Sequence, residues 1–330
     1  MIKVKASFTG IIILIIFIIV FIVISLEAPI TNTNEIIVTI PYNSSSAQII
    51  EEFNQKGFLQ PAWFYKTYIK ILYKTKHSYI QAGSYKIPEE VSNNELLENI
   101  FNRKYFYGKK ITFPEGLNIY EFASILHKEI NVDSTKFIQR VLSKDFIKKR
   151  GINAPTLEGY LMPNTYYFNE DQPIDQIINT LVESQKKIIS DNSKEKKSFL
   201  NDYQALILAS IIQAETPLAE EMALVSSVYH NRLQRSMLLQ ADPTILYAIY
   251  PRKIIYASDL ILDNKYNTYK YKGLPPTPIN NPSSIAIHAA FNPEKTNYFY
   301  FVKANDTSSS HLFSSSYAQH RKNVKNYRNN

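Results

Sequence analysis

An uninterrupted apolar run close to the N-terminus constrains the fold of this chain more than any other feature. Residues Phe8 to Leu26 carry no charge, and Thr9 and Ser25 are their only polar side chains. Nineteen residues of helix are about 28 Å long, close to the thickness of the hydrocarbon core of a bilayer. The run therefore predicts a transmembrane anchor, and the rest of the chain has to fold outside the bilayer core.

The residues that flank this run predict its orientation. Lys3 and Lys5 precede it, and positively charged flanks stay on the cytoplasmic side of a membrane. We expect a cytoplasmic tail over residues 1–7, a single-pass anchor over residues 8–26, and the remaining chain outside the cytoplasm. A cleaved signal peptide is the alternative, but residues 25–29 offer only a poor cleavage site.

The composition excludes several other classes of function. Hydrophobic residues make up 45% and charged residues 20% of the 330, which allows a globular core. The absence of cysteine excludes disulfides, thiolate metal sites and a cysteine nucleophile. The six histidines lack the spacing of metal ligands, so we expect no metal and no cofactor. The net charge of +8 is scattered and accompanies no nucleic-acid-binding motif, so no nucleic-acid partner is expected.

A pattern of strand, proline, capping residues and helix occurs three times after the anchor. The strands end at Pro41, Pro88 and Pro114, and Ser or Asn residues that can cap a helix follow each proline. The first two units predict a compact β-α-α-β subdomain over residues 34–105. Residues 106–330 are mostly helical with short strands, so the predicted fold class is α+β.

The helices of this second part are predicted from their apolar periodicity. They cover Asp133–Leu142, Pro173–Ile189, Gln204–Glu215 and Leu218–Gln234. Pro217 separates the last two, because proline cannot continue a helix but can begin one. Prolines predict a structured loop region over Tyr266–Pro293, and aromatic and β-branched residues predict a strand over Tyr298–Lys303.

The helix that ends at Glu215 carries the strongest chemical signal. Glu215 follows Leu208, Ile211 and Ile212 at helical spacing, so its carboxyl extends an apolar face. Partial desolvation would raise the pKa of this carboxyl, and a protonated glutamate is the acid that a glycosidic oxygen needs before its bond breaks. The alternative is that the apolar face ends just before Glu215, which would leave this residue in solvent.

Six motifs occur in order along the chain. They are Leu157–Tyr166, Leu208–Thr216, Val228–Leu233, Leu239–Thr244, Tyr266–Tyr269 and Gly273–Pro276. Together they resemble the endolytic murein transglycosylase family, also called YceG-like. The resemblance implies a membrane helix, a LysM-like subdomain, here residues 34–105, and a catalytic domain outside the membrane, here residues 106–330.

The resemblance also implies a reaction, which is a lytic cleavage within the glycan strands of peptidoglycan and not a hydrolysis. The family's catalytic glutamate maps onto Glu215, which would protonate the oxygen between N-acetylmuramic acid and N-acetylglucosamine. The resulting carboxylate would take the proton of the muramic C6 hydroxyl, which attacks C1 and closes a 1,6-anhydro ring. The enzyme would process or terminate nascent strands from the periplasmic side of the bacterial inner membrane.

The chain departs from the family at two positions. Many members carry a second acid where this chain has Gln213, so Glu215 is the only acid of its motif. Met162 stands where an aromatic residue is common, and we expect little effect from this change.

A further set of motif residues is predicted to bind the substrate or to support the site. It comprises Glu158, Gln240, Asp242, Tyr266, Asn267, Thr268 and Tyr269. Asp242 could orient sugar hydroxyls or stabilise positive charge at C1, and it could equally cap the next helix. The segment Tyr266–Tyr269 could stack on sugar rings and bind N-acetyl groups, or it could pack structurally. Glu158 could brace the site through hydrogen bonds.

Two other functions stay open from the sequence. A non-catalytic peptidoglycan-binding scaffold would have lost the catalytic acid, whereas Glu215 is present. A hydrolytic muramidase would need a carboxylate that activates water, and Asp242 is the candidate within the motifs. Besides glycan strands, cell-wall synthases and division or elongation proteins are candidate partners.

Overall fold

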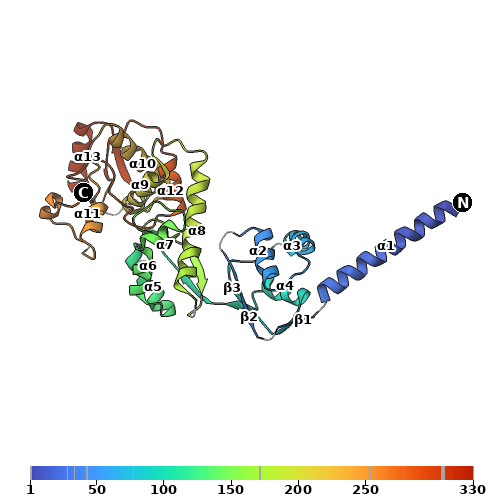
Figure 1. Ribbon diagram of the computed structural model, residues 1–330. Coiled ribbons are helices and arrows are strands. Elements are labelled where there is room, and N and C mark those ends of the chain that lie inside the picture. Colours follow the sequence, from blue (N-terminus) through green and yellow to red (C-terminus); the bar gives the residue numbers. More distant parts are fainter. Residues whose placement is uncertain are drawn as a thin grey trace. The chain divides into compact units, whose positions relative to one another are not determined.

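The computed structural model describes residues 2–329, except for residues 28, 33, 42–43, 77, 171, 253 and 306–308. Its mixed α and β elements, drawn in Figure 1, confirm the predicted α+β class. The chain divides into two compact units. The first consists of Met1–Ile111 with Tyr166–Asp171, and the second of Thr112–Thr165 with Gln172–Asn330.

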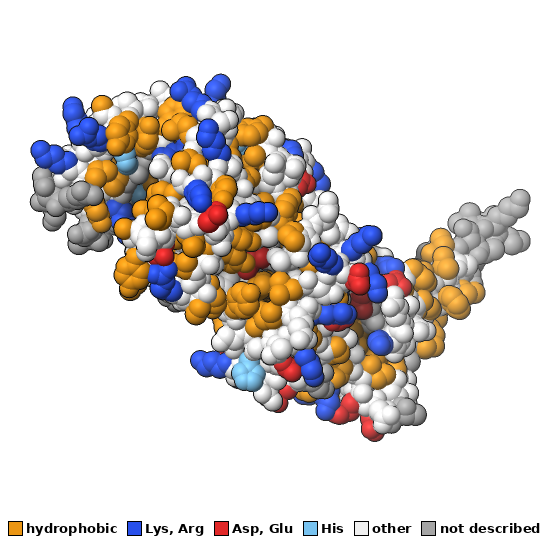
Figure 2. Space-filling view, turned by 60° about the vertical axis from the view of Figure 1, so that its left-hand side comes forward, with side chains coloured by type: hydrophobic (Ala, Val, Ile, Leu, Met, Phe, Trp, Pro, Cys, Tyr) orange, Lys and Arg blue, Asp and Glu red, His pale blue; other side chains and the backbone are white. Residues whose placement is uncertain are grey.

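Helix α1 covers Ile2–Glu27 and contains the apolar run that the sequence placed in a helix. Its segment Gly10–Glu27 has a mean hydropathy of 3.2, and only 6% of that segment is buried. Figure 2 shows hydrophobic side chains around the described part of this helix. A helix of this length and composition, with its apolar side chains uncovered, is compatible with a single-pass membrane anchor.

The first unit is built on a small antiparallel sheet with helices packed against it. The sheet order is β2-β3-β5, with β2 at Ile36–Ile40, β3 at Gly83–Ile87 and β5 at Phe106–Tyr107. The other elements are β1 (Pro29–Thr31), which pairs with β4 (Glu90–Ser92), and the helices α2 (Ser46–Gln55), α3 (Ala62–Lys76) and α4 (Asn93–Phe101). The order β2-α2-α3-β3 is the β-α-α-β order that the sequence pattern predicts.

Local capping explains where these helices begin. Ser45 and Gln48 form a reciprocal capping box at the start of α2, and the Ser92 hydroxyl accepts from the Glu95 amide at the start of α4. The unit closes around a core that includes the fully buried rings of Phe53 and Tyr85.

The second unit is organised around one buried helix, α9. Its elements are α5 (Ile119–Ile130), α6 (Ser134–Val141), α7 (Lys144–Lys148), α8 (Ile174–Ser193), α9 (Asp202–Glu215), α10 (Ala219–Gln234), α11 (Asp242–Ala248), η1 (Ala257–Ile261), α12 (Ser284–Phe291), β8 (Tyr300–Lys303), β9 (His311–Ser314) and α13 (Tyr317–Asn329). Strands β6 (Lys109–Thr112) and β7 (Thr165–Phe168) form a further pair, and most of their residues belong to the first unit. Helices α10 and α12 both pack on α9, as Figure 1 shows.

Two sequence predictions about this unit need correction. The apolar face expected on α9 is not a face, because every residue from Ala205 to Ile212 is buried and this stretch of the helix is covered on all sides. The loop region expected over Tyr266–Pro293 contains α12. Between Pro282 and Pro293 the chain has no proline, and the Ser283 hydroxyl caps an apolar helix there by accepting from the Ala286 amide.

Candidate active site

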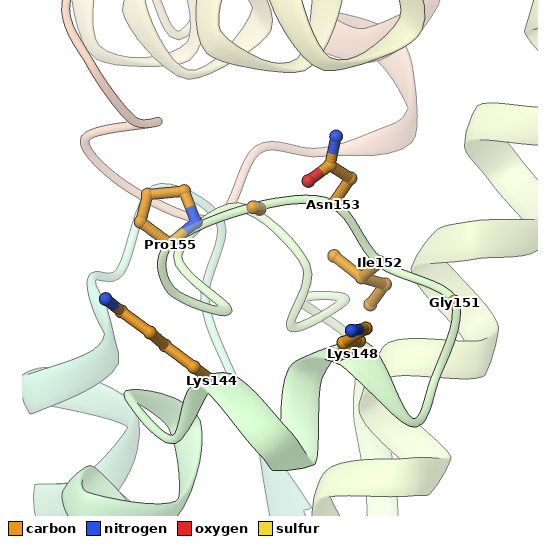
Figure 3. Close-up of a pocket in the computed structure, with 7 residues that line it drawn as sticks. Lys144, Lys148, Gly151, Ile152, Asn153 and Pro155 are labelled. Atoms are coloured by element: carbon orange, nitrogen blue, oxygen red, sulfur yellow. The ribbon is translucent and has the colours of Figure 1, made fainter.

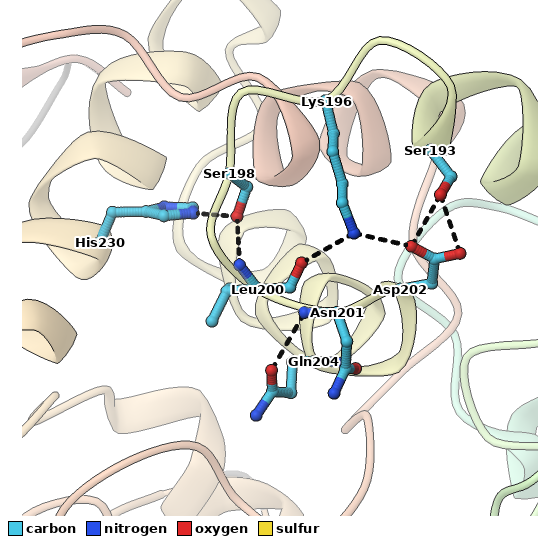
Figure 4. A network of polar contacts seen from close by, with 8 residues as sticks. All are labelled: Ser193, Lys196, Ser198, Leu200, Asn201, Asp202, Gln204 and His230. Carbon is cyan, nitrogen blue, oxygen red and sulfur yellow. Dashed lines mark hydrogen bonds and ion pairs between the residues drawn. The ribbon is translucent and has the colours of Figure 1, made fainter.

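The two helices that carry the candidate acid and its neighbour are fixed at their ends. Asp202, at the start of α9, accepts from the Ser193 hydroxyl at 2.8 Å and from the Lys196 ammonium at 3.2 Å. The Ser198 hydroxyl lies 2.7 Å from Nε2 of His230 on α10 (Figure 4). These contacts connect the end of α8, the start of α9 and the middle of α10, so the positions of side chains along α9 and α10 are coupled.

Helix α9 ends at the candidate acid for a local reason. Thr216 has extended backbone angles, and its hydroxyl accepts from the Leu218 amide, which turns the chain through Pro217 into α10. Glu215 is therefore the last helical residue. Its Oε1 accepts a hydrogen bond of 2.6 Å from the Tyr229 hydroxyl of α10.

The Glu215 carboxyl opens into a pocket of about 390 Å³. The pocket is lined by Glu215, Tyr229, Arg232, Leu239, Gln240, Asp242, Tyr269, Tyr300, Phe301, Tyr317 and His320. Glu215 keeps part of its surface accessible although protein atoms surround its carboxyl. A ligand in the pocket can therefore reach a carboxyl that is largely removed from water.

This environment holds the proton of Glu215 near neutral pH. Burial raises the pKa of Glu215 to about 7, and the nearby charge of Asp242 adds to the increase. The hydrogen bond from Tyr229 and the positive charge of Arg232 act in the opposite direction. The Glu215 carboxyl is therefore desolvated, as the sequence predicts. The cause differs from the prediction, because α9 is covered on all sides from Ala205 to Ile212 and does not have a single apolar stripe.

Asp242 is the second carboxyl of the pocket. It is the first residue of α11, and its Oδ1 accepts a bond of 2.5 Å from the Tyr269 hydroxyl. No side chain caps the start of α11 with a hydrogen bond, so Asp242 does not cap this helix. Gln240, two residues earlier, has a positive φ of 52° and lies exposed at the pocket rim.

Glu158 lies outside the pocket and is completely buried. Its carboxyl accepts from the Ile119 amide at 3.3 Å, the Tyr247 hydroxyl at 3.1 Å and the Asn281 amide group at 3.1 Å. Burial raises the pKa of Glu158 to about 8 despite these donors. The three bonds connect segments far apart in sequence, which fits the bracing role considered for this residue.

The segment Tyr266–Tyr269 divides between the pocket and the interior. Tyr269 lines the pocket, whereas buried Asn267 donates to the carbonyls of Leu260 and Leu262. The Thr268 hydroxyl accepts from the Ala241 amide, next to the pocket residues Gln240 and Asp242. Asn267 and Thr268 therefore have a supporting position, and their polar atoms are not free to bind sugar.

Tyr266 also supports the fold around the site. Its hydroxyl lies 2.7 Å from that of Thr277, and its ring packs against Tyr247. Gln213 accepts a hydrogen bond of 3.0 Å from the Ser283 amide. This is the position at which the sequence departs from the family motif, where a second acid is common. Neither side chain lines the pocket.

Several pocket residues were not identified from the sequence. Arg232 is buried and donates to the carbonyls of Phe299 and Leu239, which fixes its charge beside the site. Tyr300 stacks on His320 at 5.1 Å, and both line the pocket. Tyr229 and Arg232 belong to the motif Val228–Leu233 and are three residues apart. This helical spacing is the sequence signal that places their side chains on the same side of α10.

A larger hollow elsewhere in the second unit has no carboxyl group that could act as a glycosidic acid. It measures about 570 Å³ and is lined by Lys144, Lys148 and the segment 151–155, as Figure 3 shows. Its lining contains no carboxyl, histidine or hydroxyl side chain. The described residues also include no cluster of three or more His, Cys, Asp or Glu side chains that could hold a metal. The Glu215 pocket is therefore where we place the chemistry.

The pocket has the properties of an acid–base site that acts on an uncharged polar ligand. One carboxyl can carry a proton near pH 7, and tyrosine rings with hydroxyl groups provide surfaces for stacking and hydrogen bonding. Comparison with known proteins then identifies the family. The profile of the YceG-like family matches residues 38–326, and the chain belongs to this family.

Individual relatives agree with this assignment. The endolytic murein transglycosylase of Bacillus subtilis (strain 168) is 30% identical over 284 residues, which cover 80% of this chain and 78% of the relative. That of Streptococcus pneumoniae serotype 2 (strain D39) is 27% identical, with 87% of this chain covered. The chain spans only 57% of the length of the streptococcal protein.

A solved structure supports the fold. The crystal structure of a YceG-like protein from Listeria monocytogenes is 30% identical, with a TM-score of 0.57, and the match covers 87% of this chain and 98% of that one. The resemblance inferred from the six sequence motifs is thus confirmed.

Proposed function

We propose that this chain is a lytic transglycosylase that cleaves the β-1,4 bond between N-acetylmuramic acid and N-acetylglucosamine within glycan strands. The product would carry a 1,6-anhydro-N-acetylmuramic acid end. The observation that carries this proposal is the Glu215 carboxyl, whose pKa is raised to about 7 in a tyrosine-lined pocket. The names of the curated relatives support the same class of enzyme.

In the first step, protonated Glu215 donates its proton to the glycosidic oxygen as the bond from this oxygen to C1 of the muramic residue breaks. The N-acetylglucosamine residue leaves with a free hydroxyl, and positive charge develops at C1. Asp242 shares the pocket with Glu215, and we assign it the stabilisation of this charge or the orientation of the sugar.

In the second step, the Glu215 carboxylate takes the proton of the muramic C6 hydroxyl, whose oxygen bonds to C1. Glu215 is then protonated again and ready for another cycle. The Tyr229 hydroxyl, 2.6 Å from Oε1, stabilises the carboxylate between the two steps. Because the nucleophile belongs to the substrate, one protein carboxyl is sufficient, and the tethered hydroxyl lowers the entropic part of the barrier.

The rest of the chain would serve this reaction at the membrane. We assign α1 to a single-pass anchor in the inner membrane and the β-α-α-β region, residues 34–105, to a LysM-like subdomain that holds glycan. The second unit would act on nascent strands in the periplasm and terminate or process them. Cell-wall synthases and division or elongation proteins are the partners that such a position makes accessible.

Replacement of the acid tests the proposal. Glu215→Gln keeps the shape of the side chain and can accept from Tyr229, but it cannot donate or take the proton. General acid–base catalysis contributes roughly 10²–10⁴-fold, and we expect a loss at or above the upper end because one group serves both steps. The assay is mass spectrometry of the ends released from purified sacculi, with circular dichroism as the measure of folding.

The matched control is Asp242→Asn, which we expect to be slower than the wild type but active. Substantial turnover by folded Glu215→Gln protein would remove Glu215 from its role. Complete loss only in Asp242→Asn would assign the acid to Asp242. A hydrolytic muramidase, the alternative that needs Asp242 to activate water, would give reducing ends one water heavier than anhydro ends.

A further inference from the structure

The end of α1 is packed tightly against the start of α3 within the first unit. The Phe21 ring stacks on Trp63, with 5.8 Å between ring centroids and 9° between planes. Phe64 meets the same Phe21 ring edge-on at 5.7 Å. The Ser25 carbonyl accepts from the Tyr65 hydroxyl and from the Asn93 amide group, and Ser25 is buried. The start of α3 is therefore fixed to the last two turns of α1.

The place of Phe21 along α1 determines the surroundings of Trp63. Phe21 precedes Glu27, the last residue of the helix, by six residues, which is about 9 Å along the axis. A helix that crosses a bilayer through Leu26 places a ring at that level inside the outer part of the bilayer. Trp63, which stacks on this ring, then has to enter the headgroup region, where tryptophan is favoured.

The exposure of Trp63 agrees with a lipid neighbour. Trp63 is the only tryptophan of the chain, and 65% of its surface is uncovered. Ile71, two turns further along α3, is 52% exposed. Large apolar side chains on the outside of a small unit are costly in water but not in the membrane interface.

These two residues belong to one face of α3. The exposed residues Trp63, Thr67, Lys70, Ile71 and Lys74 recur at the spacing of a single helix stripe. On the opposite side, Tyr65 and Ile69 are buried in the core. Lys70 and Lys74 form no ion pair with any carboxylate among the described residues. A face with tryptophan, isoleucine and unpaired lysines is typical of a helix that lies on an anionic lipid surface.

We propose that this stripe, the Trp63–Lys74 face of α3, lies on the membrane surface from which α1 emerges and contacts anionic lipid headgroups through Lys70 and Lys74. The proposal rests on the membrane-anchor role that we assign to α1. The apolar helix α1 meets this face through the Phe21–Trp63 stack. The membrane would hold the first unit at a fixed height and orientation, so the anchor would not act as a loose tether.

Because Trp63 is the sole tryptophan, its fluorescence reports on this face in the full-length protein. The protein is reconstituted into vesicles of phosphatidylcholine and phosphatidylglycerol, with or without brominated phosphatidylcholine, and the vesicles are purified by flotation. We expect blue-shifted emission that brominated lipid quenches. The control is the double variant Trp63→Phe, Ile261→Trp, which moves the probe to a residue of the second unit that is 78% exposed; its emission should stay red-shifted and unquenched.

Flotation separates the two possible failures. A protein that does not float with the vesicles would refute the anchor, and with it this inference. A protein that floats, but whose Trp63 emits as in water and is not quenched, would overturn the inference and leave the anchor intact.

Charge reversal tests the lipid contact of the lysines. The Lys70→Glu, Lys74→Glu variant should lose about half of the quenching on vesicles with phosphatidylglycerol, because each lysine near such a surface contributes attraction. The matched pair Lys144→Glu, Lys148→Glu changes the net charge equally in the second unit and should leave the quenching unchanged. Equal quenching in wild type and the Lys70, Lys74 variant would refute the headgroup contact.

Discussion

The proton affinity of Glu215 results from opposing effects, of which burial and the hydrogen bond from Tyr229 are the largest. The protein around the carboxyl raises its pKa, and the Tyr229 hydroxyl lowers it by bonding to the charged form. A value near 7 leaves the acid protonated in the free enzyme at slightly acidic pH. The same balance makes the carboxylate a competent base after the proton has left, because its pKa is higher than that of an exposed glutamate.

Tyr229→Phe should therefore change the pH dependence of the reaction. Without the hydroxyl the carboxylate loses a donor, so the pKa of Glu215 rises and the alkaline limb of kcat/KM moves to higher pH. We expect a lower kcat as well, because the carboxylate between the two steps is less stabilised. The measurement is the rate of anhydro-end formation on sacculi as a function of pH. Tyr79→Phe, at an exposed position of the first unit, is the control, and an unshifted profile of Tyr229→Phe would contradict this account.

The raised pKa of Glu215 also has a consequence for stability. The pKa of Glu215 is about 7 in the folded protein and 4.5, the ordinary value for glutamate, in the unfolded chain. The contribution of this carboxyl to the free energy of unfolding therefore decreases as pH rises from about 4.5 through 7. Glu215→Gln has no such titration. We expect its melting temperature to exceed that of the wild type at about pH 8, by the equivalent of up to about 3 kcal/mol, and the gain to vanish below about pH 4.5. Exposed Glu115→Gln should show no such pH-dependent difference; a gain that is equal at both pH values would refute the assignment.

The sequence predicted part of this site. Glu215, Gln240, Asp242 and Tyr269 line one pocket because each lies near the end of an element or in a loop, where a side chain faces out of the core. The role of Asn267 could not be predicted, because an amide that binds sugar and one that binds loop carbonyls have the same sequence pattern. The same applies to residues that reach the pocket from distant strands and from α13, whose directions depend on tertiary packing.

Among the elements, the turn at Gly159 holds the loop of the first family motif against the core. Its φ is +84°, and a Cβ there would lie 2.6 Å from Cγ of Pro278 and 3.3 Å from the Leu206 side chain of α9. The Gly159 carbonyl accepts from the buried Gln185 amide group of α8 at 2.9 Å. A side chain at this position would have to displace the Pro278 ring, which is not flexible.

Gly159→Ala should for this reason destabilise the second unit strongly. Gly151 is the matched control, because its φ is +69° but a Cβ would meet nothing within 4 Å. Gly151→Ala reports the backbone strain alone, which is about 1 kcal/mol. Gly159→Ala adds a steric clash, and we expect a total loss of about 3 kcal/mol or more, measured as the decrease in melting temperature. Equal losses in the two variants would show that the contact with Pro278 relaxes without cost.

Helix boundaries were more predictable than the packing between helices. Pro217 marks the boundary between α9 and α10 because proline lacks the amide that would continue the first helix. The sequence does not predict helix α12, because its residues, Ser284–Phe291, are mostly apolar without a clear hydrophobic periodicity and follow several prolines. The exposed positions of α12 include Ile285 as well as His288, so polar residues do not mark its exposed side and the helix gives no amphipathic signal.

At the scale of the whole molecule, the division into units is not linear in sequence. The chain leaves the first unit at Ile111 and returns to it over Tyr166–Asp171. The return is held by packing, because the Tyr167 ring meets that of Phe106 edge-on at 4.3 Å. A division predicted from the pattern of strands and helices, with one boundary near residue 105, does not include such a return, because no local sequence pattern indicates it.

The orientation of the chain in a membrane is the last property that the sequence predicts and that experiment can test. Lys3 and Lys5 precede the apolar run of α1, and basic residues next to a span are retained in the cytoplasm. Alkaline phosphatase, which is active only outside the cytoplasm, should therefore be active when it is fused after Asn330. The same fusion without residues 1–27 should be inactive, because no segment remains to direct export. A Lys3→Glu, Lys5→Glu variant should reduce the active fraction, since the charge difference across the span is what orients it. Activity of the fusion that lacks residues 1–27 would contradict the role of α1 in export. A full-length fusion that is produced intact but inactive would contradict the predicted topology and would place the glycan strands out of reach of Glu215.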